Sequence, residues 1–237
     1  MNDKDSRYIL DAQIRHSFIN HLSKLVLERR IELFKKVLCN RTRYITIILE
    51  DLYQAQNASA VLRTCDCLGI QDVHVIENSR NFNVNSEVDM SASKWLNIYR
   101  YNGEPYNTKH TIQVLKKKGY RIVATSPHAN DKNIEDFDIT KGKFALMFGT
   151  ELTGLTEEAL ELADEYVKIP MYGFIESYNI SVSAALALYE LTKKLRNSRI
   201  DYSIPSEEQE IILLTWLKSS IKNCQLIEKR FLEEYYK

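Results

Sequence analysis

Polar side chains follow two predicted strands in the second half of the chain, at the point where each strand ends. The apolar run 144–149 reads as a buried strand, and the tight turn after it carries Glu151. A second short strand, 166–170, leads into a glycine-containing loop that carries Ser177 and Asn179. Polar loops at the carboxyl ends of strands are where open α/β sheets bind ligands, so these residues predict a ligand site.

Two more polar residues lie on a predicted helix that follows a β-branched strand. Asn57 stands where the helical pattern begins, a position at which asparagine is a favoured N-cap. Arg63 lies about two turns further along, where it could pair with Asp66 or Glu50 as a structural residue. A guanidinium is a poor base, with a pKa above ~12, but its planar fork suits a phosphate. Arg63 is therefore a candidate for binding a phosphate and orienting a hydroxyl group, with the proton acceptor left open.

Strands and helices alternate through the middle of the chain. Gly69 and Gly119 each follow a helical pattern at a C-cap position, and Asn179 or Ser181 can cap the last long helix. The alternation predicts an α/β fold with a mostly parallel sheet flanked by helices. The segment 94–102 is half strand-like, and no nucleotide-binding fingerprint of the G-x-G-x-x-G or P-loop type is present. The predicted strands are 44–49, 72–77, 120–125, 144–149 and 166–170, and the predicted helices are 57–68, 108–118, 156–165 and 179–196.

Both ends of the chain are predicted to be helical extensions of this α/β body. Residues 5–39 carry apolar side chains near helical spacing, with basic residues between them. A polar linker containing Pro205 precedes one or two further helices at the carboxyl end. The predicted organisation is a basic helical extension over 1–43, an α/β domain over 44–196 and a helical extension over 197–237.

Charge is unevenly distributed along the chain, although the formal net charge is zero. Residues 1–43 hold ten Lys and Arg against five Asp and Glu, whereas residues 44–190 hold 13 against 20. A basic extension joined to an acidic body suits a protein that grips a polyanion through the extension. A solvated helix face is the alternative. The residues expected to contact the polyanion are Arg29, Arg30, Arg41 and Arg43.

The cysteines and histidines give no indication of a metal site. The four cysteines form no C-x-x-C pair, and the five histidines are scattered. Cys65 and Cys67 are two residues apart in a helical pattern, so they are expected on different faces. No apolar run approaches the ~18 residues of a membrane span, and the amino terminus is polar and acidic, unlike a signal peptide. The thiols therefore read as the reduced cysteines of a cytoplasmic protein.

Three groups of residues recur in a distinctive order. The first is N-x-x-A-x-x-R-T from Asn57, and the second is F-G-x-E-x-x-G from Phe148. The third joins Ile-Pro-Met at 169–171 to S-x-N-x-S-x-S-A from Ser177. Together they resemble the three motifs of the SpoU/TrmH branch of the SPOUT RNA methyltransferases. The helical ends resemble the extensions of its tRNA guanosine-18 2′-O-methyltransferase subfamily.

The resemblance implies a fold and an activity that the residue pattern alone does not reach. It implies a deep trefoil knot near the carboxyl end of the α/β domain, one of the rare exceptions to unknotted topology. It also implies a homodimer that binds S-adenosylmethionine in the knot without a metal. The implied reaction is methyl transfer to a ribose 2′-hydroxyl of tRNA, at guanosine 18.

The resemblance also assigns roles to individual residues. It implies a catalytic role for Arg63 at an RNA phosphate, with Asn57 in the active site and Glu151 holding the active-site loops. Ser177 and Asn179 are implied beside the ribose or the methionine end of the cofactor. Contacts to the cofactor are implied mainly through main-chain groups, at Thr125, Gly149, Ile169, Met171 and Tyr178. The RNA-binding residues are those of the basic extension, Arg29, Arg30, Arg41 and Arg43.

Two alternatives stay open at this point. The first is a 2′-O-methyltransferase of the same family that acts on ribosomal RNA or on the tRNA wobble position. The wobble-type relatives lack helical extensions, and the ribosomal type carries a compact α/β amino-terminal domain that residues 1–43 cannot form. The second is a catalytically silent RNA-binding module on the same fold, which the intact polar residues of the three motifs argue against.

Overall fold

The computed structural model describes residues 11–79, 81–103, 106–126, 132–150, 152–175 and 177–236. The chain divides into two compact units. One unit combines the two ends of the chain, Met1–Arg41 and Ser203–Lys237, and the other is Thr42–Tyr202. The terminal segments that the sequence separates into two extensions therefore fold together as one helical unit.

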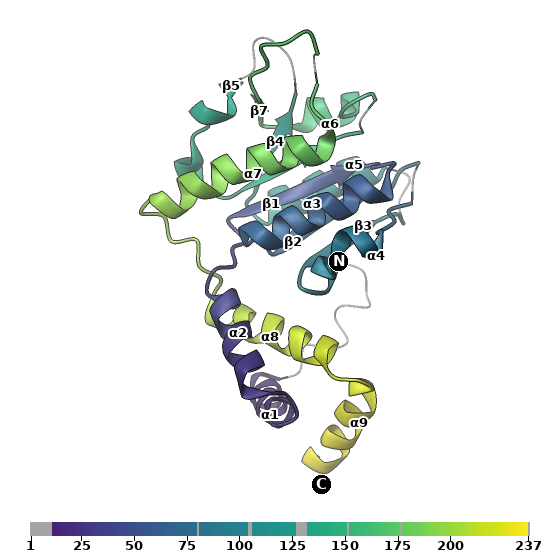
Figure 1. The fold of residues 1–237 in the computed structure, drawn as a ribbon, viewed down its shortest axis with the longest axis vertical. Coiled ribbons are helices and arrows are strands. Elements are labelled where there is room, and N and C mark those ends of the chain that lie inside the picture. Colours follow the sequence, from purple (N-terminus) through teal and green to yellow (C-terminus); the bar gives the residue numbers. More distant parts are fainter. Residues whose placement is uncertain are drawn as a thin grey trace. The chain divides into compact units, whose positions relative to one another are not determined.

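The larger unit is built on a seven-stranded sheet in which every recorded strand pair is parallel (Figure 1). The strand order is β3-β2-β1-β6-β4-β7-β5, so strands far apart in sequence become neighbours. This arrangement confirms the α/β fold predicted from the alternating pattern. The strands are β1 Ile45–Glu50, β2 Asp72–Ile76, β3 Asn97–Tyr101, β4 Arg121–Thr125, β5 Lys132–Asn133, β6 Phe144–Phe148 and β7 Glu165–Lys168.

Helices cover both faces of this sheet because its central strands are apolar on both sides. In β1, Ile45, Ile47 and Leu49 face one core cluster, and Ile48 faces the other. The first cluster is closed by α3 Ala55–Leu68 and α7 Ile180–Asn197, which Figure 1 shows together on one side of the sheet. The second is closed by α5 Asn107–Lys117 and α6 Glu157–Leu162.

The ends of these elements follow local chemistry. Gly69 adopts a positive φ angle of 81° as the C-cap of α3, which confirms that prediction. Gly119 also has a φ angle of 81°, but the prediction that it is the C-cap of α5 is wrong, because α5 ends at Lys117 and Lys118 holds the C-cap position. Thr156 caps α6 through its side chain, as Asn179 caps α7. The half strand-like segment 94–102 contains β3, at the edge of the sheet. Short helical turns complete the unit: α4 Ser86–Asp89, η2 Ala92–Lys94, η3 Ile134–Asp136 and η4 Ile139–Lys141.

The smaller unit contains four helices within its described residues. They are α1 Ala12–Ser23, α2 Glu28–Leu38, α8 Ser206–Ser220 and α9 Cys224–Tyr235. The predicted helical segment 5–39 is thus two helices, and its first residues, 5–10, lie outside the described part of the chain. The Phe18 and Phe231 rings pack with their centroids 4.8 Å apart, and Phe34 packs edge-on against Trp216 at 5.7 Å, so the amino- and carboxyl-terminal helices share one core. None of the helices in the described residues is long and apolar enough to cross a membrane.

Candidate active site

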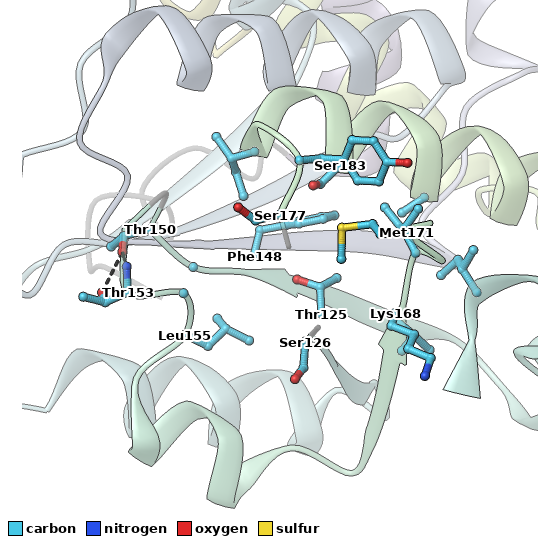
Figure 2. Close-up of a pocket in the computed structure, with 18 of the residues that line it drawn as sticks. Thr125, Ser126, Phe148, Thr150, Thr153, Leu155, Lys168, Met171, Ser177 and Ser183 are labelled. Carbon is cyan, nitrogen blue, oxygen red and sulfur yellow. Dashed lines mark hydrogen bonds between the residues drawn. The ribbon is translucent and has the colours of Figure 1, made fainter. Parts of the chain in front are cut away.

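A pocket of about 340 Å³ lies where β4, β6 and β7 end. Thr125 and Ser126 enter it from the end of β4, and the turn after β6 supplies residues 149–150 and 152–155. The loop after β7 and the first turns of α7 close the remaining side (Figure 2). The pocket therefore occupies the carboxyl edge of the sheet, as the polar loops predicted.

The turn after β6 brings two stretches of backbone into direct contact at Gly149. A Cβ atom placed on Gly149 would lie well under 3.0 Å from the carbonyl group of Gly154 and from the amide nitrogen of Leu155. The turn is pinned by paired backbone hydrogen bonds between Thr150 and Gly154, of 2.9 and 3.1 Å. Only glycine fits at 149, so one wall of the pocket is made of main chain.

All five residues predicted to contact a cofactor line this pocket. Thr125, Gly149, Ile169, Met171 and Tyr178 come from four separate stretches of sequence, yet they converge on one cavity. Thr125 is held in place by donating its hydroxyl to the carbonyl oxygen of Met147, at 2.7 Å. Ser177, predicted as catalytic, also lines the pocket, and Figure 2 shows it near Phe148 at the base of the loop before α7.

Asn57 and Asn179 lie in contact, although 122 positions separate them in the chain. The Nδ2 atom of Asn179 donates to Oδ1 of Asn57 at 3.2 Å, and Asn57 is buried. The prediction that Asn57 is the N-cap of its helix is wrong, because α3 begins at Ala55 and Gln54 holds the N-cap position. Asn57 thus lies in the first turn of α3, where its side chain turns toward the start of α7.

Arg63 is exposed on α3, six residues after the buried Asn57. Six residues correspond to ~9 Å of rise along a helix and to a rotation that separates the two side chains by about a third of a turn. Glu50, one of the structural partners considered for Arg63, instead accepts hydrogen bonds from Thr108 and Thr156. Among the described residues, those that line the pocket do not include Arg63, Asn57 or Asn179. Glu151 lies outside the described residues.

The model of the SpoU rRNA Methylase family matches residues 44–189, which is more than half of the chain. The chain belongs to the SpoU rRNA methylase family. The matched region contains the whole sheet, all the residues that line the pocket and the Asn57–Asn179 contact. The predicted trefoil knot follows from membership of this knotted family.

Individual relatives of this SpoU methylase agree in sequence and structure. It is 46% identical to the tRNA (guanosine(18)-2′-O)-methyltransferase of Borreliella burgdorferi over 210 residues, covering 89% of this chain and 94% of that protein. It is 32% identical to the enzyme of the same name from Thermus thermophilus, over 80% of this chain and 95% of that protein. The solved structure of the A. aeolicus TrmH/SpoU tRNA modifying enzyme superposes with a TM-score of 0.73, at 27% identity, covering 83% of this chain and 98% of that one.

Three buried carboxylates that sequence reasoning did not single out hold the loops of this SpoU methylase. Glu50, at the end of β1, accepts from the amide and hydroxyl of Thr156 at 2.9 Å each, which fixes the start of α6 beyond the pocket wall. Asp51 adopts a positive φ of 50° and accepts from the amide nitrogens of residues 78 and 79. Glu77 accepts from Arg100 and from the amide nitrogen of Phe82.

The electrostatics of Glu77 follow from those contacts. Burial acts to raise the pKa of Glu77, but hydrogen bonds from Arg100 and Phe82 outweigh it and hold the pKa below its usual value. Glu77 is therefore a charged anchor for the loop after β2 at neutral pH. In the sequence, Glu50, Asp51 and Glu77 are marked only as carboxylates at strand ends that polar loops follow. Solvent-exposed acids occur in the same pattern, so the sequence does not predict that these three are buried.

The four arginines predicted to bind RNA have different surroundings. Arg29 and Arg30 are exposed on α2 of the helical unit. Arg41 is 2% exposed and stacks over the Trp216 ring at 5.4 Å, inside the same unit. Arg43 belongs to the α/β unit, where its Nε lies 3.0 Å from the carboxylate of Asp72. Arg41 is thus buried and Arg43 is ion-paired, whereas Arg29 and Arg30 keep exposed side chains, with the Arg30 guanidinium over the Phe34 ring at 5.7 Å.

Among the residues that the structure describes, the cysteines and acids do not gather as metal ligands would. Cys65 is buried and Cys67 is exposed, which confirms that the two thiols lie on different faces of α3. Within the described ranges, no group of three or more His, Cys, Asp or Glu residues is arranged to hold a metal ion.

Proposed function

We propose that this protein transfers a methyl group from S-adenosylmethionine to the ribose 2′-hydroxyl of guanosine 18 in tRNA. The observation that carries this proposal is the convergence of all five predicted cofactor residues and Ser177 on one pocket. Two relatives, of which this chain covers 94% and 95% of the length, are named for this activity. The reaction of a tRNA-modifying enzyme belongs in the cytoplasm.

The pocket suits a cofactor with an adenosine and an amino-acid end. Its volume of about 340 Å³ lies within the roughly 300–1,000 Å³ of small-molecule sites. Phe148, Leu155 and Ile169 offer apolar surface, while Thr125 and Ser126 offer hydroxyl groups. The close backbone approach at Gly149 places main-chain groups against the ligand, which agrees with recognition through amides and carbonyls. When bound, S-adenosylmethionine supplies an electrophilic methyl group.

The residues of the chain are proposed to position the substrate. The Asn57–Asn179 contact joins the starts of α3 and α7 and gives the ribose a fixed polar surface. Ser177 lines the pocket, and it stands two residues before Asn179 in the sequence. Arg63, exposed on α3, grips an RNA phosphate and thereby aligns the hydroxyl group, a role that its planar fork suits. Glu151 is proposed to hold the loop after β6, as the family motif implies.

We propose that the protein acts as a homodimer through an apolar stripe on α7. Val182, Leu186 and Tyr189 recur at helical spacing and are 44%, 44% and 59% exposed. The loop before α7 adds Phe174 and Ile175, which are also exposed. Apolar side chains collected on one helix face and the adjoining loop indicate a surface that another protein chain covers. We propose that a second copy of this chain covers the stripe, because the stripe adjoins the pocket. The exposed Arg63 of one copy could then act at the site of the other.

The dimer is tested by introducing charge into the stripe. Leu186→Lys is expected to give a monomer in sedimentation velocity, because an ammonium group cannot be buried there without a partner. Met90→Lys is a matched control, since Met90 is exposed on a different element of the same unit. A Leu186→Lys protein that stays dimeric would place the interface elsewhere.

The basic extension is proposed to bind tRNA through Arg29 and Arg30 on α2. Both are exposed, and they stand in the segment with the largest excess of positive charge. Because the α/β unit is acidic, the attraction for a polyanion has to come largely from elsewhere in the chain. Arg41 and Arg43 are left out of this grip because their side chains already have packing partners.

The activity is tested by methyl transfer from labelled S-adenosylmethionine to bulk tRNA and, separately, to ribosomal RNA. We expect label in tRNA, and mapping of 2′-O-methyl groups should locate it at guanosine 18. Loss of that single modification from the tRNA of a strain lacking the gene is the matching result in the cell. Label in ribosomal RNA alone, or at the wobble position, would favour the alternative substrates, and no label in either RNA would favour the silent binding module.

A further inference from the structure

Helix α7 presents one polar side chain to the pocket, that of Ser183. The residues of α7 that line the cavity are Ile180, Ser183 and Ala187, whose spacing of three and four places them on one helix face. Ile180 and Ala187 are apolar, so Ser183 supplies the hydrogen-bonding side chain on this wall. In the view of Figure 2, Ser183 lies on the α7 side of Phe148 and Thr125 lies on the other side. Ser183 belongs to the third motif, but the resemblance assigns it no role.

The hydroxyl group of Ser183 is not used by the helix. Serine and threonine inside a helix often donate to the carbonyl oxygen four residues earlier, as Thr192 of α7 does to Leu188 at 2.6 Å. The carbonyl oxygen four residues before Ser183 is that of Asn179, and it accepts the main-chain amide of Ser183 at 2.9 Å. Among the described residues, the Ser183 hydroxyl itself has no hydrogen-bond partner, and the residue is half-buried. A donor and an acceptor are therefore left for a ligand of the pocket.

We infer that Ser183 binds the cofactor, through a hydrogen bond between its hydroxyl group and the adenosine part of S-adenosylmethionine. The ribose of the substrate is placed at Asn179, which starts α7 and contacts Asn57. Ser183 follows Asn179 by four residues, ~6 Å along the helix axis, so it lies away from the point where the methyl group meets the ribose. The inference rests on the proposed function, which supplies both the ligand and the ribose site.

The chemistry of this wall suits adenosine better than the amino-acid end of the cofactor. Ile180 and Ala187, on either side of Ser183 along the helix face, give apolar surface that suits a flat purine ring. The ring nitrogens and ribose hydroxyls of adenosine are neutral groups, which a serine hydroxyl can match as donor or as acceptor. The ammonium and carboxylate groups of the amino-acid end are bound best by charged partners, and α7 brings no charged side chain to the pocket.

Replacing Ser183 by alanine tests the contact directly. Alanine is the better helix former, so Ser183→Ala keeps α7 and removes only the hydroxyl group. S-adenosylmethionine should bind about fivefold more weakly in calorimetric titration, the effect of losing one net hydrogen bond. 5′-Methylthioadenosine, which keeps the adenosine part but lacks the amino-acid end, should lose affinity by the same factor. Ser17→Ala on α1 is the matched control with parental affinity, since Ser17 is also a half-buried helical serine whose hydroxyl has no partner in the described part of the chain.

Kinetics separate a role in binding from a role in the reaction itself. Because Ser183 is placed at the adenosine, Ser183→Ala should lower kcat/KM for the cofactor about fivefold through a higher KM. Parental affinity for S-adenosylmethionine in Ser183→Ala would overturn the inference, and so would weaker binding of S-adenosylmethionine with unchanged binding of 5′-methylthioadenosine. An active parent with an indifferent Ser183 refutes only this contact. A parent that binds S-adenosylmethionine but does not methylate tRNA refutes only the proposed function.

Discussion

The substitution Gly149→Ala tests whether the wall of the pocket is built as described. It adds one methyl group at a position where a Cβ would lie well under 3.0 Å from the backbone of Gly154 and Leu155. Gly149 has no positive φ angle, so alanine meets no conformational penalty of its own there. Any effect of the substitution therefore reports the close approach of the two backbone stretches.

The size of the effect can be worked out from the contacts. The backbone at 154–155 must retreat by more than about 1 Å before the new methyl group reaches ordinary van der Waals separation. That movement breaks or stretches the paired Thr150–Gly154 hydrogen bonds, which are 2.9 and 3.1 Å long. Two net hydrogen bonds are worth about 2 kcal/mol, and overpacking adds about 1 kcal/mol or more. We expect the free energy of unfolding to fall by roughly 3 kcal/mol from these two contributions.

The assay combines thermal unfolding with calorimetric titration of S-adenosylmethionine. If the wall moves, the cofactor should bind at least about tenfold more weakly, which corresponds to a loss of about 1.4 kcal/mol. Gly103→Ala is the matched control, since a Cβ there meets nothing within 4 Å and the φ angle is not positive. Parental affinity and parental stability in Gly149→Ala would refute the described path of residues 149–155.

Three further outcomes are expected. Arg63→Ala should lower kcat by about a hundredfold or more with little change in cofactor affinity, and Arg63→Lys should recover little, because an ammonium lacks the bidentate fork. Replacing Arg29 and Arg30 by glutamine should weaken tRNA binding in salt titrations and lower the salt slope by about 0.7–0.9 per lost phosphate contact. Burial lowers the pKa of His74 to about 3, so between pH 6.5 and 3 the unfolded chain binds the extra proton. As the pH falls through this range, the free energy of unfolding of the parental protein should therefore decrease by about 1.4 kcal/mol per pH unit relative to that of His74→Gln. Urea unfolding at several pH values measures this difference.

The fold could be predicted from the sequence wherever the local signal is strong. The β-branched run at 44–49, the glycines after α3 and α5, and the Asn179 cap all gave elements close to those observed. Helix boundaries were less certain, and the N-cap assigned to Asn57 failed because its amide bonds to Gln54 and Asn179 instead of to backbone donors. Both roles suit asparagine, and only the tertiary neighbours decide between them.

The sheet order lay beyond the sequence pattern. Strand β1 pairs with β6, which follows it by about a hundred residues, and no periodicity encodes such a pairing. The union of the two chain ends in one helical unit depends in the same way on contacts such as Phe18 with Phe231. The pocket could be predicted through the resemblance because its residues belong to spaced motifs, whereas Glu50 acts through Thr108 and Thr156, partners that a linear pattern does not reveal.

The pocket proposed for the cofactor and the residues proposed to position the substrate lie at different parts of the sheet edge, so we expect that they can be perturbed separately. The pocket is formed at the ends of β4, β6 and β7, while Asn57 follows β1. Glu50 joins the two regions, because this buried carboxylate at the end of β1 accepts both hydrogen bonds offered by Thr156. A buried carboxylate satisfied by hydroxyl and amide donors is costly to disturb. Substitution of Glu50 should therefore affect cofactor affinity and turnover together.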